Sequence, residues 1–391
     1  MSERTRTLAF VGLVLLAATL PARAEDPFRD GEKAFQKAHE LLQQKYVDDK
    51  VTDDQMWRAA TAGLLHGVGN GKWDKLLSPS ELAALKADLV GEVVGLGVHI
   101  SVDEQAGVAN VEGIVPGSGA ERAGLMVGDK ILRLDGKALK GLNEGEVARS
   151  MRGKAGTSAT LTILRDAEIL TRTIKRAPFV IDPIVSMILP GGAGLVQVRM
   201  FTEKTPALMK AALEKLQAAG MKALILDVRS NEGGRYDSML QCAGQLLPKG
   251  ALVVTELRRS GGVEEQHTST EPVVSVPMAV LVNGVTASGA EILAGALKHA
   301  GARVVGKRTV GKWNAQWIEE LGNGWAIKFT TIVFRAPWGA NLDGRGLDPD
   351  VEVEEDPGQL ARAAAIRNGE KRLAADPQLR VAVTLLKLAP R

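Results

Sequence analysis

The sequence contains a single cysteine, Cys242, so no disulfide can form within the chain. The residues around Cys242 follow an apolar helical pattern, which predicts a buried small side chain rather than a nucleophile. The chain also has little excess of either sign of charge. It contains 49 Lys and Arg and 46 Asp and Glu, which gives a formal net charge of +3. With so small an excess and no basic stripe, we do not expect the chain to bind nucleic acid.

Long apolar runs are missing as well. The run over residues 8–20 is too short to span a bilayer comfortably, and no later stretch is long enough. Arg4 and Arg6 precede this run and Ala22-Arg23-Ala24 follows it, which is the pattern of a cleaved export signal. We therefore expect residues 1–24 to be a signal peptide that sends the mature chain to the periplasm, where it could associate with the cell envelope.

The 391 residues leave room for several domains. Residues 25–90 carry apolar side chains at helical spacing and predict a helical N-terminal region. Residues 91–176 consist of short β-rich runs separated by glycine, with one late helix over 143–151. Over residues 177–355 strands alternate with helices, which predicts a partly parallel sheet covered on its faces. Residues 356–391 predict a helical tail, so the fold class is α+β multidomain.

Glycine-rich loops mark the β-rich region. It opens with Gly95-Leu96-Gly97-Val98, and a second glycine-rich motif covers residues 116–132. In such a loop, successive backbone N–H groups can turn toward the carboxylate of a peptide, which then adds as a strand beside a helix. The region resembles a PDZ domain. The resemblance implies that Leu96, Gly97 and Val98 bind an apolar C-terminal tail, and that Val147 and Met151 line its groove.

One serine lies where a strand gives way to a helix. Ser288 follows the strand predicted over residues 278–282, at the positive end of the next helix, where an oxyanion is favoured. Ser288-Gly289-Ala290-Glu291 also fits a capping box, which is a common helix start. The chain has no G-x-S-x-G motif, and none of its five histidines falls in a recognisable Ser-His-Asp arrangement.

A lysine can replace histidine as the base if burial keeps it neutral. Lys312 follows a short apolar strand and precedes Trp313, which is a plausible desolvating setting.

The order of motifs is more specific than any one of them. Asp227-x-Arg229-x-Asn231-x-Gly233-Gly234 comes first, Asn283-Gly284 and Ser288 follow, and Gly311-Lys312 and Gln316 come last. This order resembles the carboxyl-terminal processing peptidases, or tail-specific proteases, over nearly all of the mature chain. The resemblance implies a crotonase/ClpP-like peptidase core and a serine-type endopeptidase that cleaves proteins near their C-termini.

The same resemblance assigns the site. Ser288 would be the nucleophile, Lys312 its base and Gln316 the support of that base. Gly233 or Gly234, together with Gly289, would form the oxyanion hole. No metal or organic cofactor is implied. The expected partners are exported proteins with apolar C-termini and further copies of the chain, and an activating lipoprotein adaptor is considered as well.

The chain departs from the family pattern at several positions. Lys312 follows Ser288 by 24 positions, one fewer than usual, and the bulky Trp313 replaces a small residue after the lysine. His299 stands where the family often has aspartate, and Gly289 and Ala290 replace small serines or alanines. Two alternatives therefore stay open: a catalytically inactive PDZ scaffold of the same family, and a crotonase-like acyl-CoA enzyme. The export signal and the PDZ-like region argue against the acyl-CoA enzyme.

Overall fold

The computed structural model describes residues 30–387 except 49, 70, 71, 90, 91, 104, 116, 143 and 181. The predicted signal peptide, residues 1–24, lies outside this part. The chain divides into two compact units, Met1–Thr61 and Ala62–Arg391, which are described separately. In the part of the chain that the structure describes, no helix is long and apolar enough to cross a membrane.

The first unit contains α1 (Gly31–Lys45) and the start of α2 (Asp53–Val68), as the helical spacing predicts. The rings of His39 and Trp57 stack with centroids 4.3 Å apart and join the two helices. Helix α1 buries none of its residues, and its apolar side chains Leu41 and Leu42 are 40% and 49% exposed. This unit therefore presents apolar surface to its surroundings.

The second unit contains a small β-domain with its own core. Its sheet has the order β3-β4-β5-β7-β8, with β6 paired to β5, and the short strands β2 and β9 pair at its base. The hairpin from β5 to β6 turns at Asp135 and Gly136, both at positive φ, as is typical of an Asp-Gly hairpin turn. The elements are β2 (Glu92–Gly95), β3 (Val98–Asp103), β4 (Val108–Ile114), α4 (Gly119–Arg122), β5 (Lys130–Leu134), β6 (Lys137–Ala138), α5 (Glu144–Met151), β7 (Ser158–Arg165), β8 (Glu168–Lys175) and β9 (Ala177–Val180).

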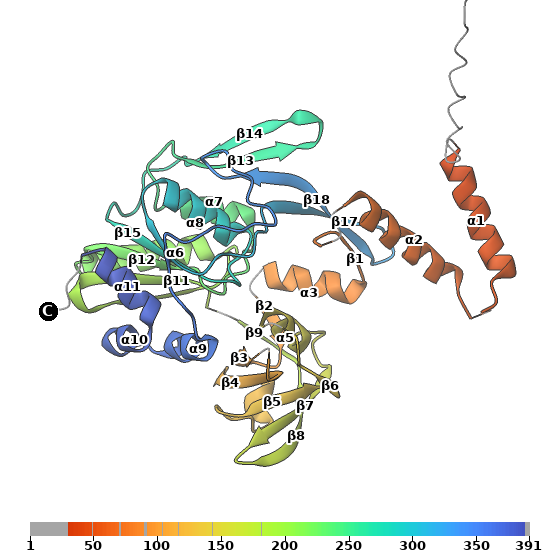
Figure 1. Cartoon of the computed structure of the whole chain (residues 1–391), viewed down its shortest axis with the longest axis horizontal. Helices are drawn as coiled ribbons and strands as arrows, with labels where there is room; N and C mark the ends of the chain where they lie inside the picture. Colours follow the sequence, from red (N-terminus) through yellow and green to blue (C-terminus); the bar gives the residue numbers. More distant parts are fainter. Residues whose placement is uncertain are drawn as a thin grey trace, which may run out of the picture. The chain divides into compact units, whose positions relative to one another are not determined.

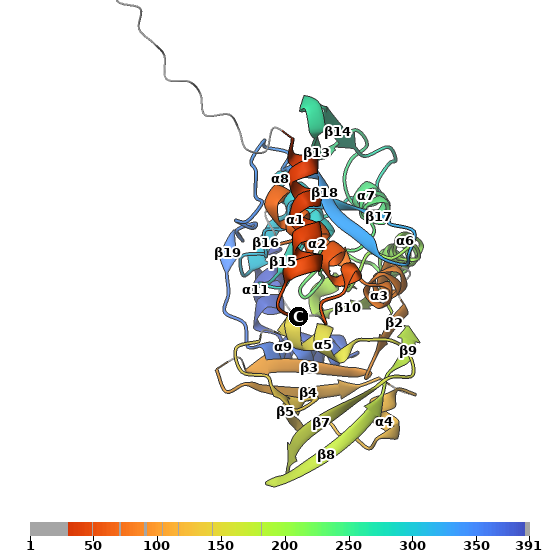
Figure 2. The ribbon, with the colours of Figure 1, turned by 90° about the vertical axis from the view of Figure 1, so that its right-hand side faces the viewer.

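The larger domain is built on a six-stranded sheet of order β10-β11-β12-β15-β16-β19, in which all neighbours except β10 and β11 are parallel. Its strands are buried on both faces, which explains their unbroken apolar runs. Alternate residues pack under α6, α7 and α8 on one face and under α11 on the other (Figures 1 and 2). The elements are β10 (Ile184–Ile188), β11 (Ala193–Val198), α6 (Thr205–Ala218), β12 (Ala223–Asp227), α7 (Tyr236–Gly244), β15 (Met278–Val282), α8 (Gly289–His299), β16 (Arg303–Gly306), β19 (Val351–Glu352), α9 (Pro357–Ala365), α10 (Gly369–Ala375) and α11 (Pro377–Leu385).

Cys242 lies in α7 within this core and is fully buried, as predicted. Burial raises the pKa of its thiol to about 12, so it stays protonated and inert.

A second sheet of order β1-β18-β13-β14, with β17 on the other side of β18, completes the domain. Its elements are β1 (Lys75–Leu77), β13 (Leu252–Arg258), β14 (Val263–His267), β17 (Asn314–Glu320) and β18 (Ala326–Arg335). The sequence predicts only helices over residues 25–90, and β1 corrects this. Three residues are too short for a periodic signal, and β1 is a strand because it pairs with β18, about 250 positions later. Helix α3 (Pro79–Leu89) follows it, as predicted.

Candidate active site

Ser288 lies at the turn between β15 and α8, as predicted, and its backbone is strained. Its φ is +57°, a positive value that residues other than glycine rarely adopt. The loop is held from both sides: the Ala287 N–H donates to the carbonyl of Asn231 at 2.9 Å, and the Thr286 hydroxyl donates to the carbonyl of Val228 at 2.9 Å. The strain is therefore imposed by bonds to the end of the neighbouring strand β12, and it leaves the serine side chain half-buried.

The carboxylate of Glu291 ties this turn to the loop that carries Lys312. Glu291 is fully buried and accepts the N–H of Ser288 at 2.9 Å, of Gly311 at 2.8 Å and of Lys312 at 2.8 Å, along with the hydroxyl of Thr309. Burial raises the pKa of Glu291, and the four donors act in the opposite direction. Glu291 does bond to Ser288, as in a capping box, but it also fixes the main chain of the candidate base. The sequence pattern predicts only the capping-box role of Glu291.

Lys312 is half-buried, and its Nζ lies 5.1 Å from the ring centroid of Trp73, a residue just before β1. Burial, followed by the nearby charge of Lys328, lowers the pKa of Lys312 to about 8, while Glu232 and Glu291 act in the opposite direction. The sequence expectation of a desolvated lysine agrees with this setting. The aromatic neighbour is different, however, since Trp73 rather than Trp313 covers the amine.

Trp313 points into the core. Its side chain is fully buried, and a Cβ at Gly295 of α8 would lie only 3.1 Å from its Cη2 atom. The missing side chain at Gly295 therefore provides the space that the indole occupies. The Trp313 side chain packs against Gly295 of α8, and the backbone N–H of Lys312 donates to the carboxylate of Glu291.

Gly233 packs directly against the serine. A Cβ on Gly233 would lie 2.8 Å from Ser288 Cβ and 3.2 Å from the nitrogen of Gly289, so only glycine fits here. The Gly233 N–H already donates to Asn231 Oδ1 at 2.8 Å. Within the described residues, no acceptor is bonded to the N–H of Gly234 or of Gly289. Of the three glycines predicted for the oxyanion hole, these two have free donors, and Gly289 lies at the N-terminus of α8.

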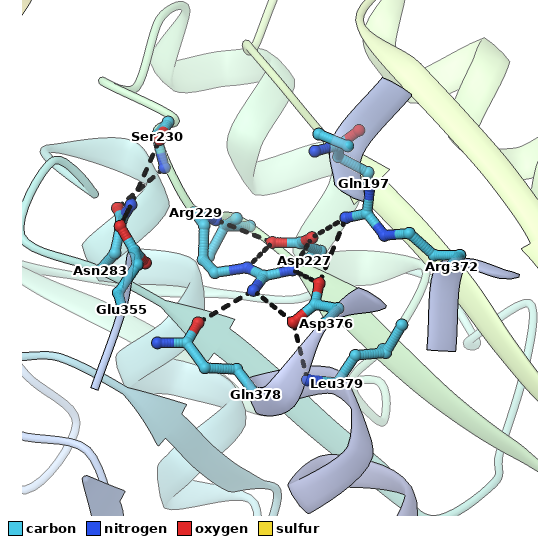
Figure 3. A network of polar contacts seen from close by, with 12 residues as sticks. Gln197, Asp227, Arg229, Ser230, Asn283, Glu355, Arg372, Asp376, Gln378 and Leu379 are labelled. Atoms are coloured by element: carbon cyan, nitrogen blue, oxygen red, sulfur yellow. Dashed lines mark hydrogen bonds and ion pairs between the residues drawn. The ribbon is translucent and has the colours of Figure 1, made fainter. Parts of the chain in front are cut away.

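A buried ion-pair network holds the strand that leads into this glycine loop (Figure 3). Arg229 Nη2 lies 2.7 Å from Asp227 and 2.7 Å from Asp376, and Nη1 donates to Gln378 at 2.9 Å. Arg372 adds a second cation to the same carboxylates. Because Asp376 begins α11, the C-terminal helices are bonded to the strand that leads into the glycine loop. Asp376 also caps α11, since it accepts the N–H of Leu379.

Gln316 does not reach the lysine. Its side-chain amide donates to Asn314 Oδ1 at 2.5 Å and lies 3.5 Å from Thr330 Oγ1. Within the described part of the chain it forms no hydrogen bond with Lys312, so its role as support of the base stays a prediction.

A cavity of about 650 Å³ joins the small β-domain to the site loops. Leu96, Gly97, Val98 and Met151 line it, as predicted for a peptide groove. Val147 does not line this cavity, because it is fully buried in the core of the β-domain, and its role in a peptide groove stays a prediction. The helix α5 turns Ala148 toward the cavity instead, one position further along. The cavity extends to Ser230, Glu232 and Val285, next to the glycine loop and the serine turn.

Comparison with known proteins places this geometry in a family. The family model of peptidase family S41 matches residues 192–353, and that of the PDZ domain matches residues 111–165. The chloroplastic C-terminal processing peptidase of Tetradesmus obliquus is 30% identical over 376 residues, which cover 86% of this chain and 80% of that protein. The chain belongs to the carboxyl-terminal processing proteases of peptidase family S41.

This S41 protease is also 29% identical over 367 residues to the carboxyl-terminal-processing protease of a Picosynechococcus strain, with 88% of each chain covered. The structure of the photosystem II D1 C-terminal processing protease matches with a TM-score of 0.58 at 27% identity, over 89% of this chain and 95% of that one. The chain is therefore a serine-type peptidase with a PDZ domain, and the predicted family and fold class are confirmed. The acyl-CoA alternative does not fit this family.

Proposed function

We propose that Ser288 and Lys312 form the catalytic dyad of this S41 protease. The observation that carries the proposal is the Glu291 carboxylate, which binds the main-chain N–H groups of both residues at 2.8–2.9 Å. One buried anion thereby fixes the nucleophile and its base relative to each other. The Lys312 amine, with its pKa lowered to about 8, is neutral in a useful fraction near neutral pH and can accept a proton.

The chemistry follows from this arrangement. Lys312 Nζ takes the proton from Ser288 Oγ as the oxygen attacks a peptide carbonyl, and the N–H groups of Gly289 and Gly234 donate to the oxyanion. The protonated amine then gives its proton to the leaving peptide nitrogen, which releases the C-terminal fragment and leaves the N-terminal part bound to Ser288 as an ester. Lys312 next takes a proton from water, which attacks the ester carbonyl, and returns a proton to Ser288 Oγ as the N-terminal part leaves as a carboxylic acid. Gln316 would act at a distance, by fixing the start of β17.

We also propose that the PDZ domain holds the apolar C-terminal tail of the substrate. The cavity that begins at Leu96, Gly97 and Val98 continues to Ser230 and Glu232, so a bound tail would place the preceding residues near the serine. Tethering of this kind raises the local concentration of the cleavage site. The substrates would be exported proteins, met in the periplasm after removal of residues 1–24, and a lipoprotein adaptor could deliver them. The exposed apolar surface of α1 favours a homo-oligomer.

The test is cleavage of an unfolded reporter that ends in an apolar tail. We would compare residues 25–391 with the wild-type sequence, Ser288→Ala, Lys312→Ala and the control Lys307→Ala, whose lysine pairs with Glu352 and not with a proposed site residue. The wild type and Lys307→Ala should cut, and the other two should not. Binding of the tail without cleavage by any variant would favour the inactive scaffold. Cleavage by Ser288→Ala would disprove the proposed nucleophile.

A further inference from the structure

The segment before β1 reaches the active site from the N-terminal region. Asp74 Oδ1 accepts both the N–H and the hydroxyl of Thr330 at 2.8 Å, and β1 then pairs with β18 with Lys75 opposite Lys328. Because β18 also pairs with β17, which begins two residues after Lys312, this segment is fixed to the sheet that carries the base. The position of Trp73, next to Asp74, is therefore set by strand pairing rather than by its preceding loop.

The indole of Trp73 covers the amine of Lys312. The distance from Nζ to the ring centroid is 5.1 Å, and the tryptophan is itself half-buried. A flat apolar ring at this distance takes the place of water molecules that would otherwise solvate an ammonium group. We propose that Trp73 is a positioning residue of this protease, whose ring excludes water from the Lys312 amine and so keeps it ready to accept the proton of Ser288. The inference rests on the proposed roles of Lys312 and Ser288.

Two effects of the ring oppose each other. The face of an indole attracts a cation and favours the protonated lysine, whereas exclusion of water favours the neutral one. Burial is the largest cause of the lowered pKa of Lys312, and we therefore expect exclusion of water to be the stronger effect of the ring.

Charged groups act on the amine from several elements. Lys328 on β18 lowers the pKa of Lys312, whereas Glu232 on the glycine loop and Glu291 on α8 raise it. Asp74 and Lys75, next to Trp73, act on Lys328. The Nζ of Lys72 lies 4.7 Å from the centroid of the Trp73 ring, so the shift measured in a Trp73 variant includes the loss of this contact.

The experiment is the pH profile of kcat/KM for the wild type, Trp73→Ala, Trp73→Leu and the control Trp317→Ala. Trp317 is an exposed tryptophan on β17 and bonds to Glu319. In the wild type, activity should rise through a midpoint at about 8 as Lys312 loses its proton. Trp73→Ala should raise this midpoint by about 1 pH unit. Trp73→Leu should raise it less, because leucine still excludes some water. All should reach similar rates at high pH, and Trp317→Ala should not shift the midpoint.

A second readout separates this inference from the dyad. The ¹³Cε resonance of Lys312 in lysine-labelled protein, assigned by its loss in Lys312→Arg, reports the same titration without any turnover. If Trp73→Leu and Trp73→Ala leave that titration unmoved, or lower it, the inference is overturned. If the titration moves but the wild type does not cleave, the inference stands and the proposed dyad fails. Should Trp73→Ala not fold, Trp73→Leu still decides the matter.

Discussion

Replacement of Lys312 by methionine should abolish cleavage and at the same time stabilise the fold. Burial lowers the pKa of Lys312 from 10.5 to about 8, so the folded state disfavours the protonated amine. At about 1.4 kcal/mol per pKa unit, the shift corresponds to roughly 3 kcal/mol of lost stability at neutral pH. Lys312 is only half-buried, so solvent screening reduces this figure, and we expect Lys312→Met to gain about 1–3 kcal/mol.

The pH dependence of that gain follows from proton linkage. Below pH 8 the lysine is protonated in both the folded and unfolded chains, so the whole penalty is present. Between pH 8 and 10.5 the unfolded chain binds more protons than the folded one, so the stability of the wild type rises with pH. The advantage of Lys312→Met should therefore be constant from pH 6 to 7.5 and shrink above pH 8.

Urea unfolding followed by circular dichroism measures the difference at each pH. The control is Lys307→Met, which removes an exposed lysine paired with Glu352 and Glu354 and should not stabilise the chain. If Lys312→Met is as stable as the wild type or less stable at pH 7, the amine is solvated. The reasoning about the neutral base would then be wrong.

Three further changes test the supports of the site. Glu291→Gln should lower kcat about 100-fold or more, since a displacement of about 1 Å between catalytic groups has that effect, and single-turnover kinetics would show an undiminished rate if the carboxylate is dispensable. Asp376→Ala should cost about 3–5 kcal/mol in urea unfolding because it leaves a buried arginine with one carboxylate fewer, and a cost under 1 kcal/mol would contradict this. Gly295→Leu should cost about 1–3 kcal/mol through overpacking against Trp313. That cost should fall when Trp313→Ala is added in a double-mutant cycle, and strict additivity would exclude the contact.

The order of the motifs predicted Ser288, Lys312 and the glycine pair through the family resemblance. In the structure these residues lie in the loops that follow β15, β16 and β12 of the parallel sheet. The carboxyl ends of parallel strands meet at one edge, so residues far apart in sequence come together there. The strands themselves were predictable from their apolar runs, as β15 shows.

What the sequence did not predict depends on partners that lie far along the chain. The strand β1 exists because of β18, Trp73 reaches Lys312 through that pairing, and Arg229 is neutralised by Asp376, 147 positions later. Val147 on α5 is buried in the core of the β-domain, and the sequence pattern alone does not show which residues of this helix the sheet covers.

The residues that break local rules lie together, and each has a compensating contact. Ser288 has a strained φ, and the ring of Trp73 lies over the amine of Lys312. Lys75 lies opposite Lys328 on paired strands, where like charges are destabilising. The bonds to Glu291 offset the first strain. Asp74, bonded to Thr330, keeps β1 in register despite the repulsion between Lys75 and Lys328. A sheet that served only stability would avoid opposing lysines. The charge of Lys328 lowers the pKa of Lys312, and Lys75 in turn lowers the pKa of Lys328, so the unfavourable pair favours the neutral form of the proposed base through Lys328.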